Sequence, residues 1–293
     1  MHRLAEAPAK AIETILMCPP RHYRIDYAIN PYMTGNVGRI DPALAVDEWD
    51  RLASLLTRLG ARIEVVTPLQ SAPDQVFMSD PGVTIGNTFY CGRFKYSERQ
   101  AEIETVKDWM TSHDFEVRQL PEGLVWEGNG ELLVGLDGQG AADGVLFGGY
   151  GIRSQMEAYE WLREATGFEI LTIQLTDPRC FHLDVCFTVL PGGYFLIYSE
   201  GMAPSDVAKI RDRAPADRIY DADEEDLALF GLNAVIVRRN VVVHNMSERM
   251  ARWLRDRDFT PCLCPIDQFV RGGGSAKCLT QKLHRLPACV QPA

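Results

Sequence analysis

Four short stretches of the chain place residues capable of nucleophilic and acid–base chemistry inside otherwise apolar runs. Cys278 follows a glycine-rich loop in RGGGSAKCL, and His182 and Asp184 stand two residues apart in FHLDVCF. Glu127 stands in WEGNGEL, and Asp80 ends the run DQVFMSD. A thiol, an imidazole and several carboxylates suit attack on a cationic carbon, because the thiolate attacks, the imidazole moves protons and the acids hold the cation.

Each of these residues also has an ordinary structural explanation. Asp80 precedes a Pro-Gly pair and suits the start of a turn, and Glu127 suits a solvated loop. His182 suits a hydrogen-bonded place in the core, and Cys278 suits a small buried apolar position. The four stretches taken together favour a shared site. The glycines before Cys278 then predict a mobile or tightly turning loop that delivers the thiol.

The spacing in FHLDVCF predicts a common direction for its two polar side chains. On a strand, residues two apart share a face. We therefore expect His182 and Asp184 to point the same way, while Leu183 and Val185 pack on the opposite face.

An internal repeat supplies the elements that must bring these residues together. An amphipathic helix, a short break and an inward strand recur five times, first in DEWDRLASLLTRLGARIEVVTPL and last in SERMARWLRDRDFTPCLCPI. The period is roughly 40 to 55 residues, which indicates a modular architecture. Pairs of strand-like runs with tight connections, such as NAVIVRR and NVVVHN, lie between the helical units. The five strands begin near Ala61, Phe115, Phe168, Asp217 and Phe259.

Each module therefore has the predicted order strand, strand, helix, strand. No linker rich in proline, glycine or serine separates the modules, so we expect one catalytic domain over residues 1–293. The predicted fold class is α/β, with five pseudosymmetric modules in a ring. Such a ring points the module ends at a central cavity, where polar residues from different modules converge.

The composition limits the partners. The chain has 293 residues, of which 46% are hydrophobic and 24% are charged, as in ordinary globular proteins. No apolar run approaches the length of a membrane span. The net charge of −10 argues against nucleic-acid binding and is compatible with a small cationic substrate. The N-terminal residues lack the order of a secretory signal, which favours the cytoplasm.

The cysteines favour reduced thiols. Eight cysteines at irregular spacing, without a C-x-x-C motif, suit neither a disulfide framework nor a structural zinc site. Cys262 and Cys264 alternate in a strand-like run, so their side chains point to opposite faces. We expect no metal and no organic cofactor. The sequence is compatible with a monomer or with a homo-oligomer.

The chain resembles the guanidine-modifying superfamily with the pentein fold, a five-module α/β propeller. That superfamily includes arginine deiminases, dimethylarginine dimethylaminohydrolases, arginine dihydrolases and amidinotransferases. FMSDPG is similar to its Asp-Pro segment and WEGNGEL to its Glu-Gly-Gly-Asp segment, while HLDVCF and RGGGSAKCLT match its His-x-Asp strand and nucleophile loop. The opening MCPPRHYRIDYAINPYM looks most like the arginine dihydrolase branch. The resemblance covers essentially the whole chain, and the last two motifs are specific as a pair.

The resemblance implies a role for each residue of the site. Cys278 would be the nucleophile on the guanidinium carbon, and His182 would protonate the leaving amine and then activate water. Glu127 and Asp184 would bind guanidinium nitrogens through charge-assisted hydrogen bonds. Asp80 would be a further guanidinium ligand.

Two more residues are implied in substrate binding. Arg153, in GGYGIRSQ, falls where family members bind the α-carboxylate of the substrate. Its alternative is an exposed residue at the start of a helix. Asn30, in INPYM, would line the pocket.

The chain departs from the family pattern at two places. Asn129 and Gly130 stand where Gly-Gly or Gly-Asp is usual. Asp80 stands where the dihydrolase-like branch usually has Asn. An Asp at this position is the pattern of deiminases and amidinotransferases. A second anion there would favour the cationic guanidinium over the neutral ureido product. We therefore predict that the reaction stops after one displacement.

The resemblance thus implies a cysteine-dependent hydrolase of the guanidino group of arginine or an arginine-like compound. A covalent thiouronium intermediate would give a ureido product and an amine or ammonia. The alternatives are an amidinotransferase with an amine acceptor and an arginine dihydrolase that forms ornithine. A papain-type peptidase fits less well, because it needs a cysteine at a helix start and an oxyanion hole. A non-catalytic guanidine or amino-acid binder would need no nucleophile.

Overall fold

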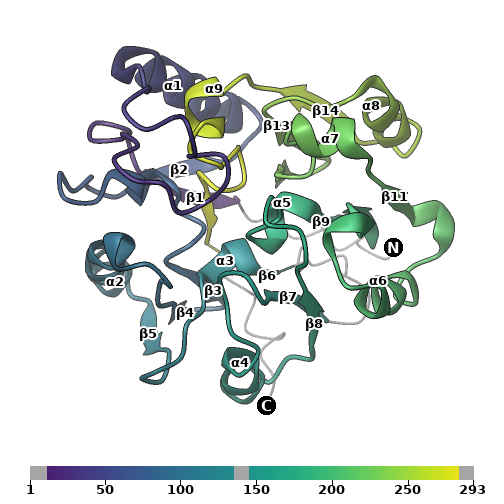
Figure 1. Ribbon diagram of the computed structural model, residues 1–293, viewed down its shortest axis with the longest axis horizontal. Coiled ribbons are helices and arrows are strands. Elements are labelled where there is room, and N and C mark those ends of the chain that lie inside the picture. Colours follow the sequence, from purple (N-terminus) through teal and green to yellow (C-terminus); the bar gives the residue numbers. More distant parts are fainter. Residues whose placement is uncertain (1–11, 135–144, 284–293) are drawn as a thin grey trace, which may run out of the picture.

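Five three-stranded sheets stand around a common centre in the computed structural model, which describes residues 12–134 and 145–283 (Figure 1). In each sheet the middle strand pairs antiparallel with the first strand and parallel with the third. The sheets comprise β15 (Gln281–Lys282), β1 (Thr14–Met17) and β2 (Arg62–Val65); β3 (Gly82–Ile85), β4 (Thr88–Cys91) and β5 (Glu116–Gln119); β6 (Leu132–Leu133), β7 (Leu146–Tyr150) and β8 (Ile170–Gln174); β9 (Phe187–Leu190), β10 (Tyr194–Ile197) and β11 (Ile219–Asp221); and β12 (Val235–Val237), β13 (Asn240–Val243) and β14 (Thr260–Leu263).

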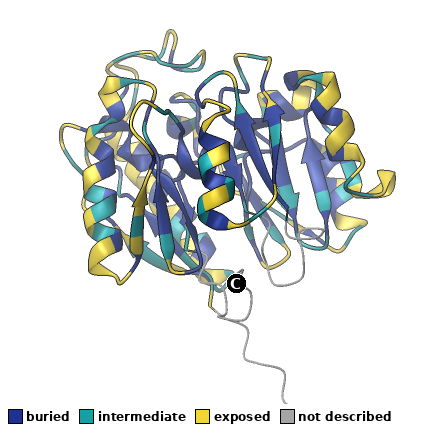
Figure 2. Cartoon of the chain, turned by 90° about the horizontal axis from the view of Figure 1, so that it is seen from below, coloured by how far each residue is buried: buried dark blue, intermediate teal, exposed yellow. Residues whose placement is uncertain are grey.

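A helix joins the second and third strands of every sheet, because two parallel strands cannot be joined by a tight turn. The five connecting helices lie outside the ring and expose one face, while the strands inside are mostly buried (Figure 2). The predicted α/β class and the predicted module order are both confirmed. That residues 1–293 form one domain stays a prediction. The helices are α1 (Pro42–Arg58), α2 (Ala101–Ser112), α4 (Ala158–Thr166), α6 (Pro204–Arg211) and α8 (Glu248–Arg255).

Local sequence explains why these helices begin where they do and how they face. At α8, the Ser247 side chain accepts a hydrogen bond from the Met250 N–H and caps the first turn. Met250 and Leu254 are fully buried against the sheets, and Arg255 pairs with Glu248 on the outer face at 3.0 Å. The apolar stripe of the helix therefore fixes which side covers the module.

The ring closes by pairing its two ends. In the first sheet, Ile15 of β1 stands opposite Lys282 of β15, and Leu16 stands opposite Gln281. This short antiparallel pair joins residues more than 260 positions apart. It places the loop that carries Cys278 in the same module as the start of the described chain.

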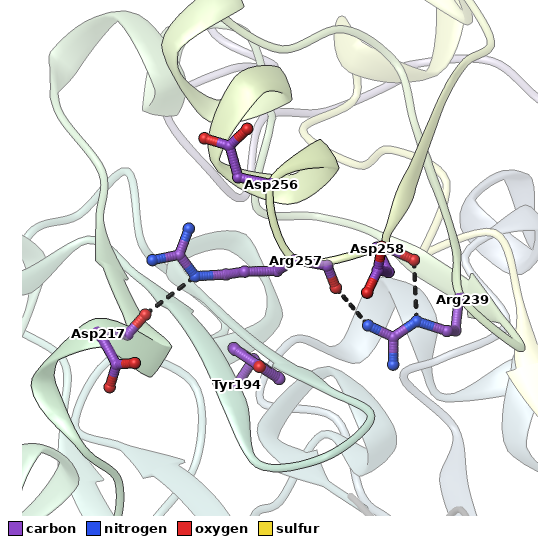
Figure 3. Close-up of a pocket in the computed structure, with 6 residues that line it drawn as sticks. All are labelled: Tyr194, Asp217, Arg239, Asp256, Arg257 and Asp258. Carbon is purple, nitrogen blue, oxygen red and sulfur yellow. Dashed lines mark hydrogen bonds between the residues drawn. The ribbon is translucent and has the colours of Figure 1, made fainter.

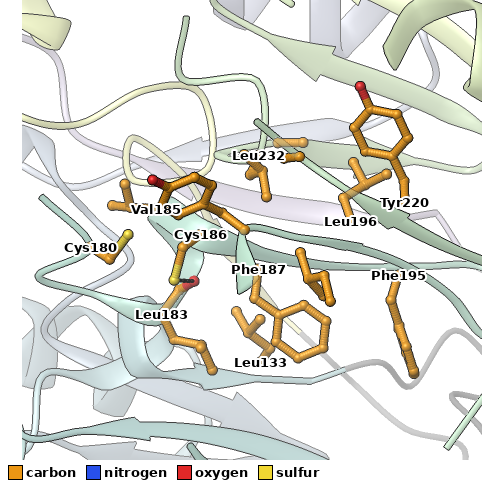
Figure 4. Close-up of a cluster of buried hydrophobic side chains, with 14 of the residues drawn as sticks. Leu133, Cys180, Leu183, Val185, Cys186, Phe187, Phe195, Leu196, Tyr220 and Leu232 are labelled. Atoms are coloured by element: carbon orange, nitrogen blue, oxygen red, sulfur yellow. Dashed lines mark hydrogen bonds between the residues drawn. The ribbon is translucent and has the colours of Figure 1, made fainter. Parts of the chain in front are cut away.

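A large aromatic and aliphatic core backs the fourth module. Phe147, Phe187 and Phe195 make edge-on contacts with ring centroids 4.9 to 5.5 Å apart. Leu183 and Val185 insert into this core and are fully buried (Figure 4). Their burial anchors the short segment that carries His182 and Asp184.

A short helical turn precedes the first strand of each module, and those named α3 and α5 lie near the centre of the ring (Figure 1). The strand predicted for residues 182–186 is wrong, because strand pairing begins only at Phe187, opposite Ile197. His182 has extended backbone, and the chain then turns as the Val185 N–H donates to the His182 carbonyl at 3.2 Å. The turns before first strands are η1 (Pro73–Val76), α3 (Gly128–Glu131), α5 (Leu183–Cys186), α7 (Glu224–Ala228) and α9 (Asp267–Val270). Three other short helices, η2 (Ser97–Arg99), η4 (Ser199–Gly201) and η5 (Ala216–Arg218), lie elsewhere in the modules.

Two further properties concern only the described residues. None of their helices combines the length and the apolar composition that crossing a membrane requires. Their seven cysteines are all free thiols.

Candidate active site

The five residues expected to carry chemistry meet at the centre of the ring. Cys278, His182, Glu127, Asp184 and Asp80 retain between 0% and 3% of their exposed surface. They come from four modules, and each lies on a turn just before a first strand. The ring thus brings equivalent positions of different modules together in one site.

The thiol and a carboxylate are in direct contact. Cys278 Sγ lies 3.6 and 3.7 Å from the two carboxylate oxygens of Asp184. Burial raises the pKa of Cys278 well above its usual value, and the negative charges of Asp184 and Asp80 raise it further. Burial also raises the pKa of Asp184 to about 6, against the opposing effects of Lys277 and His182. At neutral pH the free site therefore holds a protonated thiol.

The glycines before Cys278 serve close packing. A Cβ on Gly274 would lie 2.4 Å from the Phe77 ring and 3.0 Å from the Cβ of Cys278. Gly273 has φ of +90°, in the left-handed region that favours glycine. The loop is buried from Gly272 to Ala276. Of the two predicted forms, the structure has the tightly turning loop.

Glu127 orients the imidazole. Its Oε2 lies 2.7 Å from His182 Nε2 and accepts a hydrogen bond from Arg153 Nη1, also at 2.7 Å. Its Oε1 accepts from the Lys95 N–H at 2.9 Å. Burial alone would raise the pKa of Glu127, but Arg153 and His182 outweigh it and lower the pKa to about 2. Both oxygens of this carboxylate are thus occupied in the ligand-free site.

The other imidazole nitrogen of His182 faces Asp80. His182 Nδ1 is buried and has no hydrogen-bond partner among the described residues, and the nearest carboxylate oxygen that faces it is Asp80 Oδ1 at 3.8 Å. Burial lowers the pKa of His182, but Asp80 and Glu127 reverse this and leave it above its usual value. A Cβ on Gly130 would lie 3.2 Å from this nitrogen, so glycine keeps the space beside it open.

Asp80 is held by a buried cation that the sequence did not single out. Arg99 Nη1 donates to Asp80 Oδ2 at 2.6 Å, and the Ser79 hydroxyl donates to Asp80 Oδ1 at 2.5 Å. Arg99 also binds both oxygens of Glu102 at 2.8 Å. This bidentate grip fixes the guanidinium and with it the orientation of Asp80.

Arg153 lies in the site, and the alternative of an exposed position is wrong. The residue is 3% exposed. Its guanidinium stacks over Tyr96 and Phe181, at 4.8 and 4.9 Å from the ring centroids, and its Nη2 donates to the Ile29 carbonyl at 2.8 Å. Its pairing with Glu127 leaves a cation at the border of the site.

Asn30 joins an outer segment to the loop that carries Cys278. Its Nδ2 donates to the Gly272 carbonyl at 2.9 Å, and its Oδ1 accepts from the Tyr32 and Met33 N–H groups at 3.0 Å. It therefore contacts the loop of Cys278, without an observed contact to the thiol, the imidazole or the carboxylates of the described site.

Two residues next to Cys278 were not assigned a role from the sequence. Lys277 Nζ donates to the Asn129 carbonyl at 3.2 Å and to the Asn129 side-chain oxygen, so the ammonium faces α3. Asn233 donates from Nδ2 to Cys278 Sγ at 3.1 Å. The signal for Asn233 was its position, because it stands two residues before β12, as Asp80 stands two residues before β3.

The described residues contain no group of three or more His, Cys, Asp and Glu side chains placed to hold a metal ion.

An open depression lies at a different place on the surface. Its arginines bind backbone carbonyls: Arg257 Nε donates to the Asp217 carbonyl at 2.9 Å, and Arg239 Nε donates to the Asp258 carbonyl at 2.9 Å (Figure 3). Arg239 and Tyr194 flank the hairpin turns, which lie at the opposite end of the strands from the turns that carry the five site residues. The lining residues are Tyr194, Asp217, Arg239, Asp256, Arg257 and Asp258.

Ring and site together define a five-module α/β protein with a buried thiol, imidazole and carboxylate centre. A family model described as eukaryotic N,N-dimethylarginine dimethylhydrolase matches residues 32–285. The chain is also 30% identical, over 268 residues, to the N(G),N(G)-dimethylarginine dimethylaminohydrolase of Mycobacterium tuberculosis, with 92% of this chain and 85% of that protein covered. The chain belongs to the dimethylarginine dimethylaminohydrolase family, and its predicted relationship to guanidine-modifying enzymes is confirmed.

The chain is also similar to a cyanobacterial protein and to a solved structure of its N-terminal domain. The chain is 34% identical, over 269 residues, to the bifunctional arginine dihydrolase/ornithine cyclodeaminase ArgZ of Synechocystis sp., covering 92% of this chain and 37% of that protein. It thus spans well under half of that relative. A variant of the N-terminal domain of ArgZ, solved covalently bound to a reaction intermediate, superposes with a TM-score of 0.89 at 33% identity, covering 94% of this chain and 100% of that one.

Proposed function

We propose that this protein is a cysteine-dependent hydrolase of the guanidino group of arginine or an arginine-like compound. The observation that supports this is the contact between Cys278 and Asp184 beside a histidine whose free nitrogen faces Asp80. The two carboxylates near the thiol, Asp184 and Asp80, disfavour an anion and favour a planar cation. Charge-assisted hydrogen bonds from guanidinium nitrogens suit Asp184 and Asp80.

Binding of the cation activates the nucleophile. The negative charges that raise the pKa of Cys278 are offset when a guanidinium lies between Asp184 and Asp80. The thiol then loses its proton to solvent as the cation enters. Thiolate forms only where the substrate is present, and the free enzyme keeps its nucleophile protonated.

The reaction then runs in two displacements at one carbon. The Cys278 sulfur bonds to the guanidinium carbon, and the protonated His182 gives its Nδ1 proton to the leaving nitrogen, so ammonia or an amine departs. Neutral His182 next takes a proton from water, and the resulting hydroxide bonds to the same carbon. The carbon–sulfur bond breaks as the added hydroxyl group gives its proton to solvent. The neutral ureido product then leaves, the thiolate is restored, and His182 stays protonated for the next cycle.

Glu127 holds His182 in the orientation that these steps need, and Arg153 is the cation for a substrate α-carboxylate. If Arg153 moves from Glu127 to the substrate carboxylate, one oxygen of Glu127 also becomes free to bind the guanidinium of the substrate. Asn30 supports the loop from outside. Reduced free thiols suit a cytoplasmic location, which we propose for this protein.

The products decide between this activity and its two alternatives. We expect the purified protein, given a panel of guanidino compounds, to release one ammonia or amine and one ureido product per turnover. Ornithine with two equivalents of ammonia would instead identify a dihydrolase. Products that form only with an added amine acceptor would identify an amidinotransferase.

Two variants and one control tie the activity to the site. Cys278→Ser and His182→Ala should lose turnover of every compound in the panel. Cys91→Ser changes another buried free thiol, on β4, and should keep it. Full activity of Cys278→Ser would overturn the proposal.

A further inference from the structure

The module that contributes no predicted catalytic residue nevertheless reaches the nucleophile. Asn233 stands between α7 and β12, is fully buried, and makes four hydrogen bonds with its carboxamide. Its Nδ2 donates to Cys278 Sγ at 3.1 Å and to the Asp184 carbonyl at 3.1 Å. Its Oδ1 accepts from the backbone N–H groups of Lys277 at 3.1 Å and of Cys278 at 3.2 Å.

The chemistry of the partners fixes which end of the amide faces the sulfur. Backbone N–H groups can only donate, so the atom that faces Lys277 and Cys278 must be the amide oxygen. The NH₂ group then faces Cys278 Sγ and the Asp184 carbonyl. A flipped amide would place two donors against the two N–H groups, leaving buried donors without acceptors.

Asn233 thus forms hydrogen bonds to both members of the pair Cys278 and Asp184. It holds the backbone of the nucleophile loop through its oxygen and the turn of Asp184 through its nitrogen. The same NH₂ group supplies an N–H donor to the sulfur. The other charged groups that face this thiol are Asp184 on α5, Asp80 ahead of β3, and Lys277 on the loop itself.

We propose that Asn233 is a positioning residue for the nucleophile, which fixes the Cys278 side chain against Asp184 and donates a hydrogen bond to its sulfur as the thiolate forms. The inference rests on the proposed function, in which Cys278 attacks the guanidinium carbon. A thiolate accepts a stronger hydrogen bond than a thiol, so the donor favours the ionised form. Among two carboxylates that oppose ionisation, this neutral donor acts in the other direction.

The test measures the thiol directly. The rate at which iodoacetamide modifies Cys278 is followed against pH by mass spectrometry of its peptide, in the wild type, Asn233→Ala and Asn233→Asp. We expect the midpoint of the pH profile to rise in both variants, and more in Asn233→Asp, which adds an anion. We also expect kcat to fall by about 10- to 100-fold, with little change in KM, as for loss of a hydrogen bond to a charged group.

A matched control separates a specific effect on the position of Cys278 from a general loss of native structure. Asn240→Asp makes the same change on β13 of the same module, at a half-buried residue whose Nδ2 donates to the Val237 carbonyl. It should leave the pH profile and kcat at wild-type values. Thermal unfolding of each variant establishes which are folded, and either folded Asn233 variant suffices for the test.

The outcomes separate this inference from the proposed function. A folded Asn233→Ala protein with the wild-type alkylation profile and kcat would overturn the inference, even if Cys278→Ser abolishes turnover. A shifted profile in a protein that turns over no guanidino compound would support the positioning of the thiol and overturn the proposed function.

Discussion

The guanidinium of Arg99 donates to the carboxylate of Asp80 across 2.6 Å, and both side chains are 4% exposed. Arg99 is itself held by both oxygens of Glu102. Asp80 is therefore a fixed anion within the site. A fixed anion at this place favours a cation over a neutral ligand, which is the physical basis for expecting one displacement.

Asp80→Asn should change the products as well as the rate. Loss of this anion should lower kcat/KM for guanidino substrates by about 10- to 100-fold. Each tenfold decrease corresponds to about 1.4 kcal/mol of lost interaction between the anion and the cationic substrate. The neutral ureido compound is then less disfavoured, so we expect ornithine to appear with this variant and not with the wild type. Asp74→Asn, at a second buried carboxylate near Arg99, serves as the control and should form no ornithine. Ornithine from the wild type would refute the role given to Asp80.

Glu127→Gln should lower both stability and activity. The change leaves Arg153 buried without its anion and removes the charge that holds His182. Breaking one partner of a buried ion pair costs about 3–5 kcal/mol, measurable by denaturant unfolding. The pKa of His182 should fall, so activity that needs the imidazolium should decline from a lower pH than in the wild type.

Glu104→Gln provides the surface comparison for that variant. Glu104 pairs with Lys107 at 3.0 Å, but its side chain is 73% exposed. Exposed pairs contribute about 0–1 kcal/mol, so stability and the pH profile should stay near wild type. Equal losses in the two variants would mean that burial of the Glu127 pair has no special effect.

Glu131 makes stability depend on pH with an unusual sign. Burial raises the pKa of this fully buried acid to about 8, and Oε2 accepts from the Leu183 N–H at 3.2 Å. Between its unfolded pKa and about 8, the folded state binds more protons than the unfolded state, so stability falls as pH rises through this window. Glu131→Gln mimics the neutral acid. By calorimetry, it should match the wild type below about pH 4, gain relative stability from there to about pH 8, and keep a constant advantage above pH 8. A constant difference across this range would contradict the neutral form of Glu131.

Proton release should accompany substrate binding. If the guanidinium displaces the thiol proton of Cys278, about one proton leaves when a tightly bound, unreactive guanidino analogue is added at neutral pH. Binding enthalpy measured in buffers of different ionisation enthalpy reports this number. Cys278→Ser has no such proton and should release none. Equal proton release by both proteins would contradict activation of the thiol by the bound cation, because the released proton would not come from Cys278.

The repeat was enough to predict the ring, because each helix and each third strand carries its own apolar pattern. The site motifs were visible because Cys278, His182, Asp184, Glu127 and Asp80 interrupt apolar runs at one repeated position. The direction in which the side chains of His182 and Asp184 point could not be predicted from the alternation of faces along a strand. His182 and Asp184 converge through a turn anchored by buried neighbours.

The partners of these residues depend on long-range closure, which a single sequence does not display. Arg99, Asn233 and Lys277 lie 19 to 148 positions from the groups that they contact. The pairing of Arg153 with Glu127 likewise joins different turns. Only the ring, with β1 and β15 paired, brings such residues within hydrogen-bond distance.

The most direct measurement is the intact mass of the protein, quenched in acid during turnover of a guanidino substrate. At raised pH the Cys278 thiol is deprotonated and can still attack the substrate in the His182→Ala variant. The same variant should hydrolyse the covalent intermediate more slowly, so this intermediate should accumulate. We predict a single added group on the peptide that contains Cys278, and none in Cys278→Ser. Turnover without any adduct, or an adduct on another cysteine with Cys278→Ser still active, would contradict covalent catalysis by Cys278.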